Sequence, residues 1–314
     1  MRVVVLDDYQ DAARPSGPWS ELGEDLDLVV YHEHIADDDA LVELLAGAQV
    51  VVAMRERTPF SRARLERLPD LRLLVTTGPR NATIDLHAAR EHGIQVCGTG
   101  GLAAPTVELT WGLILALARS IPTEDRRLRD GGWQHTLGAD LAGATLGVAG
   151  LGRLGSRVAS IGLAFGMRVC AWSQHLDHER ARAIGVEPVD RDTLFAQADI
   201  LTLHLVLSER TRGLVGAEEL RAMKPTALLV NTSRGPLVDE PALLDALRSA
   251  TIAGAALDVF DQEPLPTDHP LRRLPNVVLT PHLGYVSRRN YAVFYGEVVE
   301  DIAAWMRGAP LRVL

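Results

Sequence analysis

Arg234, Glu263 and His282 stand in three polar segments, and each segment directly follows an apolar run of the sequence. Removing hydride from a secondary alcohol also requires removing its hydroxyl proton, and a histidine can carry that proton in either direction near neutral pH. A carboxylate on the other ring nitrogen fixes the tautomer and stabilises the imidazolium. A guanidinium binds a carboxylate through paired N–H groups. The three residue types together therefore suit hydride transfer at a carbon next to a carboxylate.

The apolar runs before these segments are predicted to be strands: Ala227–Val230, Ile252–Leu257 and Val277–Thr280. Ligands of open α/β sheets bind outside the carboxyl ends of the strands, so the three side chains are expected to converge at one sheet edge. Taken singly, such residues are more often a surface ion pair, a solvated loop acid and a turn histidine. Their joint placement after successive strands favours a common site.

The glycine-rich stretch Gly150–Gly155 follows the apolar run Thr145–Ala149 and precedes helix-like sequence from Ser156 to Phe165. Glycines at this spacing let the backbone approach a pyrophosphate, and the N-terminus of the helix supplies free N–H groups and a positive dipole end. The order of strand, tight turn and helix predicts dinucleotide binding rather than an ordinary glycine-rich turn.

Short apolar runs alternate with helical patterns along the chain, which predicts parallel sheets in a doubly wound α/β architecture. The first series of runs comprises Val3–Leu6, Leu28–Tyr31, Val50–Met54, Leu71–Thr76 and Ile94–Cys97. The second series comprises Leu146–Ala149, Arg168–Ala171, Ile200–Leu205, Ala227–Asn231, Ile252–Leu257 and Val277–Thr280. The first series cannot belong to the dinucleotide sheet if Leu146–Ala149 is the first strand of that sheet, so two domains are expected.

A long helix is predicted at about Pro105–Ser120, and a final helix at about Arg289–Arg307 has no strand after it. Packing the final helix on the first domain makes the chain cross between domains twice, with a ligand-binding cleft at the crossings. We therefore expect a Rossmann-type dinucleotide-binding domain (residues 100–284) inserted into a flavodoxin-like substrate domain (residues 1–99 and 285–314).

The composition excludes several function classes. The chain has 314 residues and a formal net charge of −9, which disfavours a nucleic-acid or anionic-membrane surface. Its two cysteines, Cys97 and Cys170, end apolar runs and are interpreted as buried thiols in a reducing compartment. No signal peptide or membrane span is recognised, so we expect a cytoplasmic protein. His32 and His34 lie near acidic residues that are interpreted as a helix start, and no metal site is expected.

Six ordered motifs give the chain a strong resemblance to the D-isomer-specific 2-hydroxyacid dehydrogenases. They are Gly150–Gly155, His204–Val215 with Lys224-Pro225, Asn231–Gly235, Ala256–Phe260, Glu263-Pro264 and Pro281–Gly284. The resemblance spans essentially the whole chain. It implies a homodimeric, two-domain enzyme that interconverts a 2-oxo acid and a D-2-hydroxy acid with NAD or NADP.

The resemblance also implies roles for individual residues. Arg234 would bind substrate, His282 would be the acid/base, and Glu263 would be the partner of the histidine. Formate dehydrogenases of the same superfamily have glutamine in place of Glu263, which makes formate an unexpected substrate. The implied cofactor site consists of Thr106, Gly150, Gly152, Arg153, Leu154, Gly155, Ser173, His204, Thr211, Thr232, Asp258 and Gly284.

Two other functions stay open on this scaffold. One is a phosphonate or phosphoglycerate-type dehydrogenase. The other is a non-catalytic, dinucleotide-sensing protein like the transcriptional co-repressors of the family. The complete arginine, glutamate and histidine set, without an added interaction tail or regulatory domain, favours the enzyme.

Two departures from the pattern of the family concern specificity. At the end of the second strand of the dinucleotide domain, NAD enzymes place an acid that binds the ribose diol and repels a 2′-phosphate. Here the residue is Ser173, with His175, His178 and Arg180 nearby, so NADP is expected to be tolerated or slightly favoured.

The second departure is the expected substrate loop Gly78-Pro79-Arg80-Asn81, where the family typically has Gly-Val-Gly. Gly78, Arg80 and Asn81 are the candidate substrate-binding residues. Pro79 removes one backbone N–H donor. Arg80 either reaches a second acidic group on the substrate or pairs with an acid of the protein and shapes the loop. The substrate side chain and the physiological direction are left open by the sequence.

Overall fold

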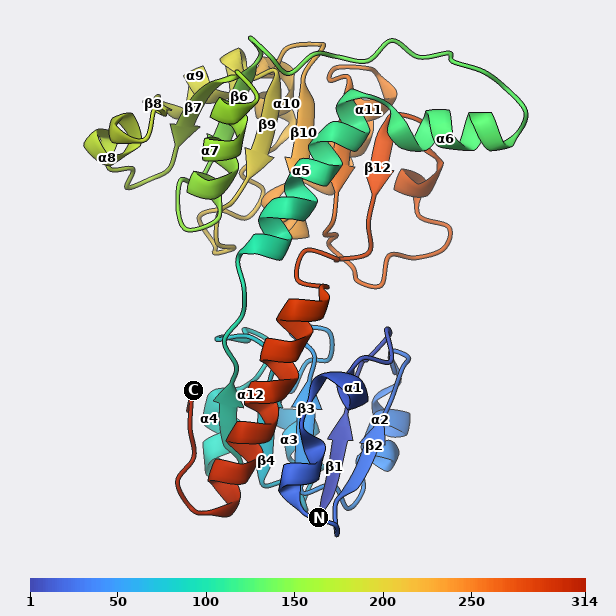
Figure 1. Cartoon of the computed structure of the whole chain (residues 1–314), viewed down its shortest axis with the longest axis vertical. Coiled ribbons are helices and arrows are strands. Elements are labelled where there is room, and N and C mark those ends of the chain that lie inside the picture. The colour runs from blue at the N-terminus through green and yellow to red at the C-terminus, as the bar shows by residue number, and fades with distance from the viewer. The chain divides into compact units, whose positions relative to one another are not determined.

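The computed structural model describes the whole chain, residues 1–314, and divides it into two compact units (Figure 1). Unit 1 consists of Met1–Leu102 and Val286–Leu314, and unit 2 consists of Ala103–Tyr285. Unit 2 is therefore inserted into unit 1. None of the helices combines the length and the apolar character needed to cross a bilayer.

Unit 1 is built on five parallel strands in the order β2-β1-β3-β4-β5, which is the flavodoxin-like order. The strands are β1 (Arg2–Val5), β2 (Asp27–Val30), β3 (Val50–Ala53), β4 (Leu73–Thr76) and β5 (Gln95–Gly98). Strands β3 and β4 are buried along their whole length and consist almost entirely of valine, leucine and alanine, as parallel strands covered on both faces do. The last three residues extend this sheet, because Val313 forms an antiparallel bridge with Cys97 at the edge strand β5.

The helices of unit 1 are short except for the last. They are α1 (Ala13–Ser16), the 3-10 helix η1 (Trp19–Leu22), α2 (Asp38–Leu44), α3 (Arg62–Leu65), α4 (Leu86–Glu91) and α12 (Arg288–Met306). Asp37 and Asp85 cap α2 and α4 with side-chain hydrogen bonds, and Ser287 caps α12. Helix α12 packs against α1, η1 and β4, which are all elements of unit 1.

Unit 2 holds seven parallel strands in the order β12-β11-β10-β9-β6-β7-β8, a Rossmann order with one added strand. They are β6 (Thr145–Ala149), β7 (Arg168–Trp172), β8 (Glu187–Pro188), β9 (Ile200–Leu203), β10 (Leu228–Asn231), β11 (Gly254–Leu257) and β12 (Val277–Leu279). The order reverses between β6 and β9, which is the switch point where such sheets bind dinucleotides. The prediction of two doubly wound parallel-sheet domains is confirmed.

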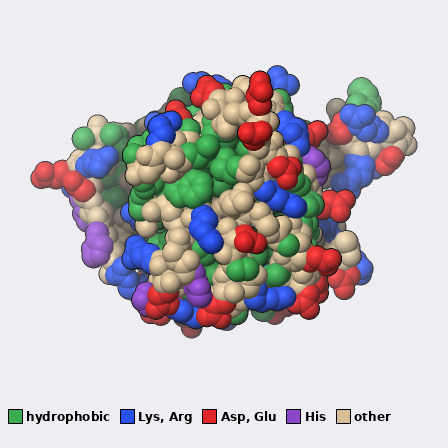
Figure 2. Space-filling view, turned by 90° about the horizontal axis from the view of Figure 1, so that it is seen from below, with side chains coloured by type: hydrophobic (Ala, Val, Ile, Leu, Met, Phe, Trp, Pro, Cys, Tyr) green, Lys and Arg blue, Asp and Glu red, His purple; other side chains and the backbone are tan.

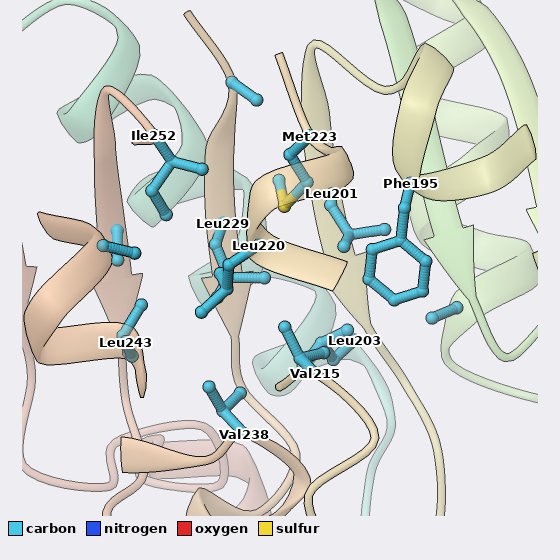
Figure 3. Close-up of a cluster of buried hydrophobic side chains, with 14 of the residues drawn as sticks. Phe195, Leu201, Leu203, Val215, Leu220, Met223, Leu229, Val238, Leu243 and Ile252 are labelled. Atoms are coloured by element: carbon cyan, nitrogen blue, oxygen red, sulfur yellow. The ribbon is translucent and has the colours of Figure 1, made fainter. Parts of the chain in front are cut away.

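The helices of unit 2 cover both faces of its sheet, apart from α6 (Ile121–Arg129), which buries none of its residues. They are α5 (Ala104–Ala118), α6 (Ile121–Arg129), α7 (Gly155–Ala164), α8 (His178–Ala183), α9 (Arg191–Gln197), α10 (Ala217–Ala222) and α11 (Glu240–Arg248), with 3-10 turns η2 (Gly235–Leu237) and η3 (Pro270–Arg273). Figure 3 shows one core, where Phe195, Leu220 and Leu243 from helices meet Leu201 and Leu229 from strands. Such burial holds the strand ends, and with them the loops of the site, in fixed positions.

The surface carries no single sign of charge on the face drawn in Figure 2, where acidic and basic side chains are interspersed. Cys97 and Cys170 are both buried free thiols, and burial raises the pKa of each to about 11. Both thiols are therefore protonated at neutral pH.

Candidate active site

Three glycines shape the turn between β6 and α7, two through close backbone contacts and one through the open space it leaves. Gly150 has a φ of 98°, and a Cβ placed on it would lie 2.6 Å from the carbonyl oxygen of His204. A Cβ on Gly155 would lie 2.0 Å from the carbonyl oxygen of Gly150. A Cβ on Gly152 would meet no atom within 4 Å, so this glycine leaves open space above the turn. Two glycines thus let the turn close tightly, and the third leaves room for a ligand to approach the backbone.

This turn is suited to a pyrophosphate. The backbone N–H groups of Arg153, Leu154 and Gly155 open the ten-residue helix α7 and have no acceptor in the protein. The Arg153 side chain is exposed, whereas Leu154 packs against the hydrophobic cluster beneath the turn. The predicted cofactor residues Gly150 to Gly155 therefore form a cradle that fits an anionic dinucleotide.

Ser173 directly follows β7, the strand next to the glycine turn, and is half-buried. Asp177 caps α8 by accepting a hydrogen bond from the N–H of Arg180 at 3.0 Å, so its carboxylate is used locally. His175 and Arg180 are exposed. At the end of this strand the side chains available to a ribose are thus a hydroxyl and basic groups.

His282 and Glu263 lie in direct contact. The Nδ1 atom of His282 is 2.5 Å from Oε2 of Glu263, while the other carboxylate oxygen accepts the N–H of Phe260 at 2.9 Å. The Nε2 atom of His282 has no protein partner. His282 has a φ of 54°, a left-handed conformation that is uncommon outside glycine and asparagine. The loop holds the imidazole in one orientation with Nε2 available to a substrate.

Asp258 holds the backbone of the His282 loop. One of its carboxylate oxygens accepts the N–H of Leu283 at 2.7 Å and the hydroxyl of Thr280 at 2.5 Å, and the other accepts the N–H of Gly284 at 2.8 Å. Its carbonyl oxygen accepts the N–H of His282 at 2.8 Å. The side chain is fully buried, and burial raises the pKa of Asp258 while these hydrogen bonds lower it. In the structure Asp258, which the resemblance places in the cofactor site, also fixes the loop that carries His282.

The other residues around this loop are tied together by hydroxyl groups. Thr106 donates its hydroxyl to the carbonyl of Gly284 at 2.8 Å. The hydroxyl of Thr110 lies 2.9 Å from that of Thr232. The start of α5 is thereby joined to the loops after β10 and β12, so Thr106, Thr232 and Gly284 lie in one region of unit 2.

Arg234 lies on a loop braced from two sides. Asn231 donates its side-chain amide to the carbonyl of Arg234 at 2.8 Å. A Cβ on the next residue, Gly235, would lie 2.1 Å from the carbonyl carbon of Phe260, so only glycine permits this approach. The half-buried Arg234 side chain donates one bond to the carbonyl of Ser233 at 2.7 Å. The backbone that carries Arg234 therefore packs on the same segment that Glu263 holds.

His204 and Thr211 follow β9 at the switch point. The Nε2 atom of His204 lies 3.0 Å from the hydroxyl of Thr202, and its Nδ1 atom is buried without a partner. Burial lowers the pKa of His204 to about 4, so the imidazole is neutral at working pH. The Thr211 hydroxyl bonds the carbonyl of Val206 at 2.7 Å and the N–H of Ser208 at 2.8 Å. Thr211 therefore shapes the loop after β9.

The predicted substrate loop lies in unit 1, directly after β4. Gly78 has a φ of 98°, is buried, and donates its N–H to the hydroxyl of Thr99 at 2.7 Å. The Asn81 side chain is buried and donates to the carbonyl of Arg55 at 2.6 Å and to the hydroxyl of Thr76 at 2.9 Å. Arg80 is exposed and forms no hydrogen bond or ion pair within its unit. The structure therefore uses the Asn81 side chain to build the loop, and gives no support to an ion pair between Arg80 and an acid of that unit.

A group of metal-ligating residue types exists elsewhere in unit 1. Asp8, Asp11 and His32 have ligand atoms within 4.8 Å of one another. The Asp8 carboxylate already accepts the N–H groups of Ala12 and Ala13 at 3.0 and 2.8 Å. This cluster is accounted for by the hydrogen bonds of its own loop.

Sequence reasoning missed the residues that brace the site. Asn231, Thr280 and the Phe260 N–H each contact a predicted site residue or its backbone. Asn231 stands inside a recognised motif, which was a usable signal. Phe260 also lies inside a recognised motif, three residues before Glu263. Thr280 contacts Asp258 on a different loop, and no local pattern predicts that contact.

The chain is similar to known proteins over most of its length. The family model described as "D-isomer specific 2-hydroxyacid dehydrogenase, NAD binding domain" matches residues 111–284. A glyoxylate reductase of Korarchaeum cryptofilum is 37% identical over 310 residues, covering 96% of this chain and 87% of that protein. A hydroxypyruvate reductase of Thermotoga maritima is 38% identical over 264 residues, covering 82% of this chain and 84% of that protein.

A solved structure is also similar to this chain over nearly its whole length. The crystal structure of a phosphoglycerate oxidoreductase from Vibrio cholerae O395 superimposes with a TM-score of 0.94 at 37% identity, covering 98% of this chain and all of that one. Sequence and fold thus point to the same group of proteins over nearly the entire chain.

Proposed function

Because the chain belongs to the D-isomer-specific 2-hydroxyacid dehydrogenase family, we propose that it reduces small 2-oxo acids of the glyoxylate and hydroxypyruvate class to D-2-hydroxy acids. It is an oxidoreductase that uses a nicotinamide dinucleotide. The observation that carries the proposal is the 2.5 Å contact between His282 and Glu263, on the sheet that also carries the glycine cradle.

When bound, the nicotinamide supplies the hydride for reduction and accepts it in the reverse reaction. His282 donates the proton from Nε2 to the carbonyl oxygen as that oxygen becomes a hydroxyl. Glu263 at Nδ1 stabilises the imidazolium before transfer and keeps the ring in place after it. In the direction of oxidation, the same Nε2 atom removes the hydroxyl proton.

Arg234 is assigned to the carboxylate and the carbonyl of the substrate. A guanidinium binds a carboxylate through two parallel bonds and places positive charge beside the oxygen that gains electron density during reduction. In unit 1, which we assign as the substrate domain, the backbone N–H groups of Arg80 and Asn81 have no acceptor in the protein and are proposed to bind a carboxylate of the substrate.

NADPH is proposed to be accepted as well as NADH. Ser173 offers the adenosine ribose a neutral hydroxyl, and the exposed His175 and Arg180 are compatible with a 2′-phosphate. An acid at this position would repel that phosphate.

The functional molecule is proposed to be a homodimer, formed through an arm of unit 2 that comprises α6 and residues 130–140. Helix α6 buries none of its residues, and Leu128, Trp133 and Leu137 of the arm are 57%, 71% and 100% exposed. The arm borders an open hollow of about 620 Å³. Exposed apolar patches mark interaction sites, and a two-fold dimer uses the same patch on both copies. The exposed apolar side chains of one copy can therefore enter the hollow of the other copy across the two-fold axis.

The dimer is tested by sedimentation velocity on the wild type and on Leu137→Asp. We expect a dimer that the substitution converts to monomer. Leu311→Asp, an exposed leucine of unit 1, is the control and should stay dimeric. A monomeric wild type would contradict the assignment.

The activity is tested by following oxidation of NADH and NADPH with glyoxylate, hydroxypyruvate, pyruvate, phenylpyruvate and oxaloacetate, and by determining the chirality of the product. We expect turnover of at least one 2-oxo acid to the D-isomer. Tight binding of NADH without turnover of any acid would instead favour a dinucleotide-sensing binding protein.

A further inference from the structure

The loop that carries Arg80 is a rigid platform. The N–H of Gly78 is bound by Thr99, and Asn81 holds the other end through Arg55 and Thr76. Thr83 adds two more bonds to the Asn81 side-chain oxygen, at 2.9 and 2.8 Å. The backbone on both sides of Arg80 is thereby fixed, while its guanidinium is left exposed.

The other guanidiniums near this sheet edge are already used by the protein. Arg55, after β3, donates to the carbonyl of Thr77 at 3.2 Å and lies 3.6 Å from Glu56. Arg57 donates to the carbonyl of Asp7 at 2.6 Å and stacks on the ring of Tyr9 at 4.2 Å. Arg80 is the guanidinium in this group that is not used in building its own unit.

The loop offers more donors than one carboxylate needs. A carboxylate is well bound by two parallel N–H donors. The backbone N–H groups of Arg80 and Asn81 are without a protein acceptor, and Pro79 has none to offer. The Arg80 guanidinium is then surplus to recognition of the reacting carboxylate.

We propose that Arg80 binds a second anionic group at the far end of the substrate, so that the preferred substrate is a 2-oxo acid with a terminal carboxylate or phosphate. This inference rests on the proposed function of the loop in substrate binding. The planar guanidinium suits both groups, because each presents two oxygens to its paired N–H donors.

The experiment compares matched substrates that differ in the second anionic group. Oxaloacetate is paired with 2-oxobutyrate, and 3-phosphohydroxypyruvate is paired with hydroxypyruvate. KM and kcat are measured for the wild type, Arg80→Gln and Arg80→Lys. Arg67→Gln removes an exposed arginine of the same unit and is the matched control. Thermal unfolding of each variant monitors the fold.

We expect the wild type to have a KM at least about tenfold lower for one doubly anionic substrate than for its partner. Arg80→Gln should abolish that preference by raising KM for the doubly anionic substrate alone, with kcat little changed. Arg80→Lys should keep part of the preference, since it retains the charge but not the paired donors. A preference for oxaloacetate would show that Arg80 binds a carboxylate. A preference for 3-phosphohydroxypyruvate would show that it binds a phosphate.

Two results would overturn the inference. One is a wild type without preference for either doubly anionic substrate. The other is an Arg80→Gln variant that loses affinity equally for both members of a pair, which would place Arg80 on the reacting carboxylate. In both cases turnover of the singly charged acids leaves the proposed function standing, whereas loss of all turnover in the wild type refutes that function itself.

Discussion

Glu263 connects His282 to the backbone that supports Arg234. One of its carboxylate oxygens lies 2.5 Å from Nδ1 of His282, and the other accepts the N–H of Phe260. The carbonyl group of Phe260 packs directly on Gly235, the residue after Arg234. The three proposed catalytic residues therefore share one framework within unit 2, and disturbing one member should alter the others.

Replacing His282 with asparagine is expected to lower kcat by about 10²–10⁴-fold, because the proton donor is lost. Asparagine tolerates the left-handed backbone at this position better than alanine, so the loop should keep its shape. NADH affinity, measured by fluorescence titration, should stay nearly unchanged. A variant that retains more than about half of the wild-type kcat would remove His282 from the mechanism.

Glu263→Gln should shift the pH dependence of ketone reduction. Glutamine can still accept the Phe260 N–H and contact the imidazole, but it does not stabilise the imidazolium by charge. Reduction requires the protonated ring, so the alkaline limb of the kcat profile should move to lower pH. The profile is to be measured under conditions where chemistry limits the rate. An unmoved limb would show that the carboxylate charge is not what prepares His282.

Asp258→Asn tests the anchor of the catalytic loop. The carboxylate accepts three donors, whereas an asparagine side chain has one oxygen and brings an NH₂ group against the N–H of Leu283 or Gly284. We expect a loss of about 1–3 kcal/mol in unfolding free energy together with a fall in kcat. Denaturant unfolding and steady-state kinetics are the measurements. Unchanged values of both would show that the loop does not depend on these bonds.

Ser173→Asp is expected to move cofactor preference toward NADH. The new carboxylate can accept from the ribose diol and repels a 2′-phosphate. The ratio of kcat/KM for NADH to that for NADPH should rise at least about tenfold, which corresponds to about 1.4 kcal/mol. Ser160→Asp on the exposed side of α7 introduces the same charge and serves as control. A constant ratio would place the selectivity elsewhere, at His175 or Arg180.

Asp301 on α12 predicts a pH-dependent stability. Its side chain is fully buried, and burial raises the pKa of Asp301 to about 7, although Arg312 lies 3.3 Å away. The pKa of Asp301 is higher in the folded protein than in the unfolded chain. The free energy of unfolding therefore falls as pH rises from about 4 to about 7. The stability of Asp301→Asn relative to that of the wild type should therefore increase as pH rises from about 5 to about 7, as measured by thermal unfolding. A difference independent of pH would contradict the assignment.

Much of the architecture could be predicted from the sequence, because the short runs rich in valine and leucine are recognisable without knowledge of tertiary contacts. Strand β8 was missed since it spans only Glu187–Pro188. Helix α6 was missed since it buries no residue and so lacks an apolar face toward the core. The proposed catalytic residues were found through motifs, but the bonds that orient them depend on which loops meet after folding. Asn81 illustrates the difference: its place in the loop was predicted, while the use of its side chain to build that loop was not.

The edge of the unit 1 sheet is closed by the last residues of the chain. The N–H of Gly98 donates to the carbonyl of Arg312 at 3.0 Å, and the N–H of Leu314 donates to the carbonyl of Val96 at the same distance. On a ribosome, every residue of unit 2 emerges before α12 and this closing segment. Unit 2 is contiguous and can fold while synthesis continues, whereas strand β5 keeps an open edge until the end. The first domain to be started is thus the last to be completed, and the edge of β5 stays unpaired until residues 312–314 have emerged.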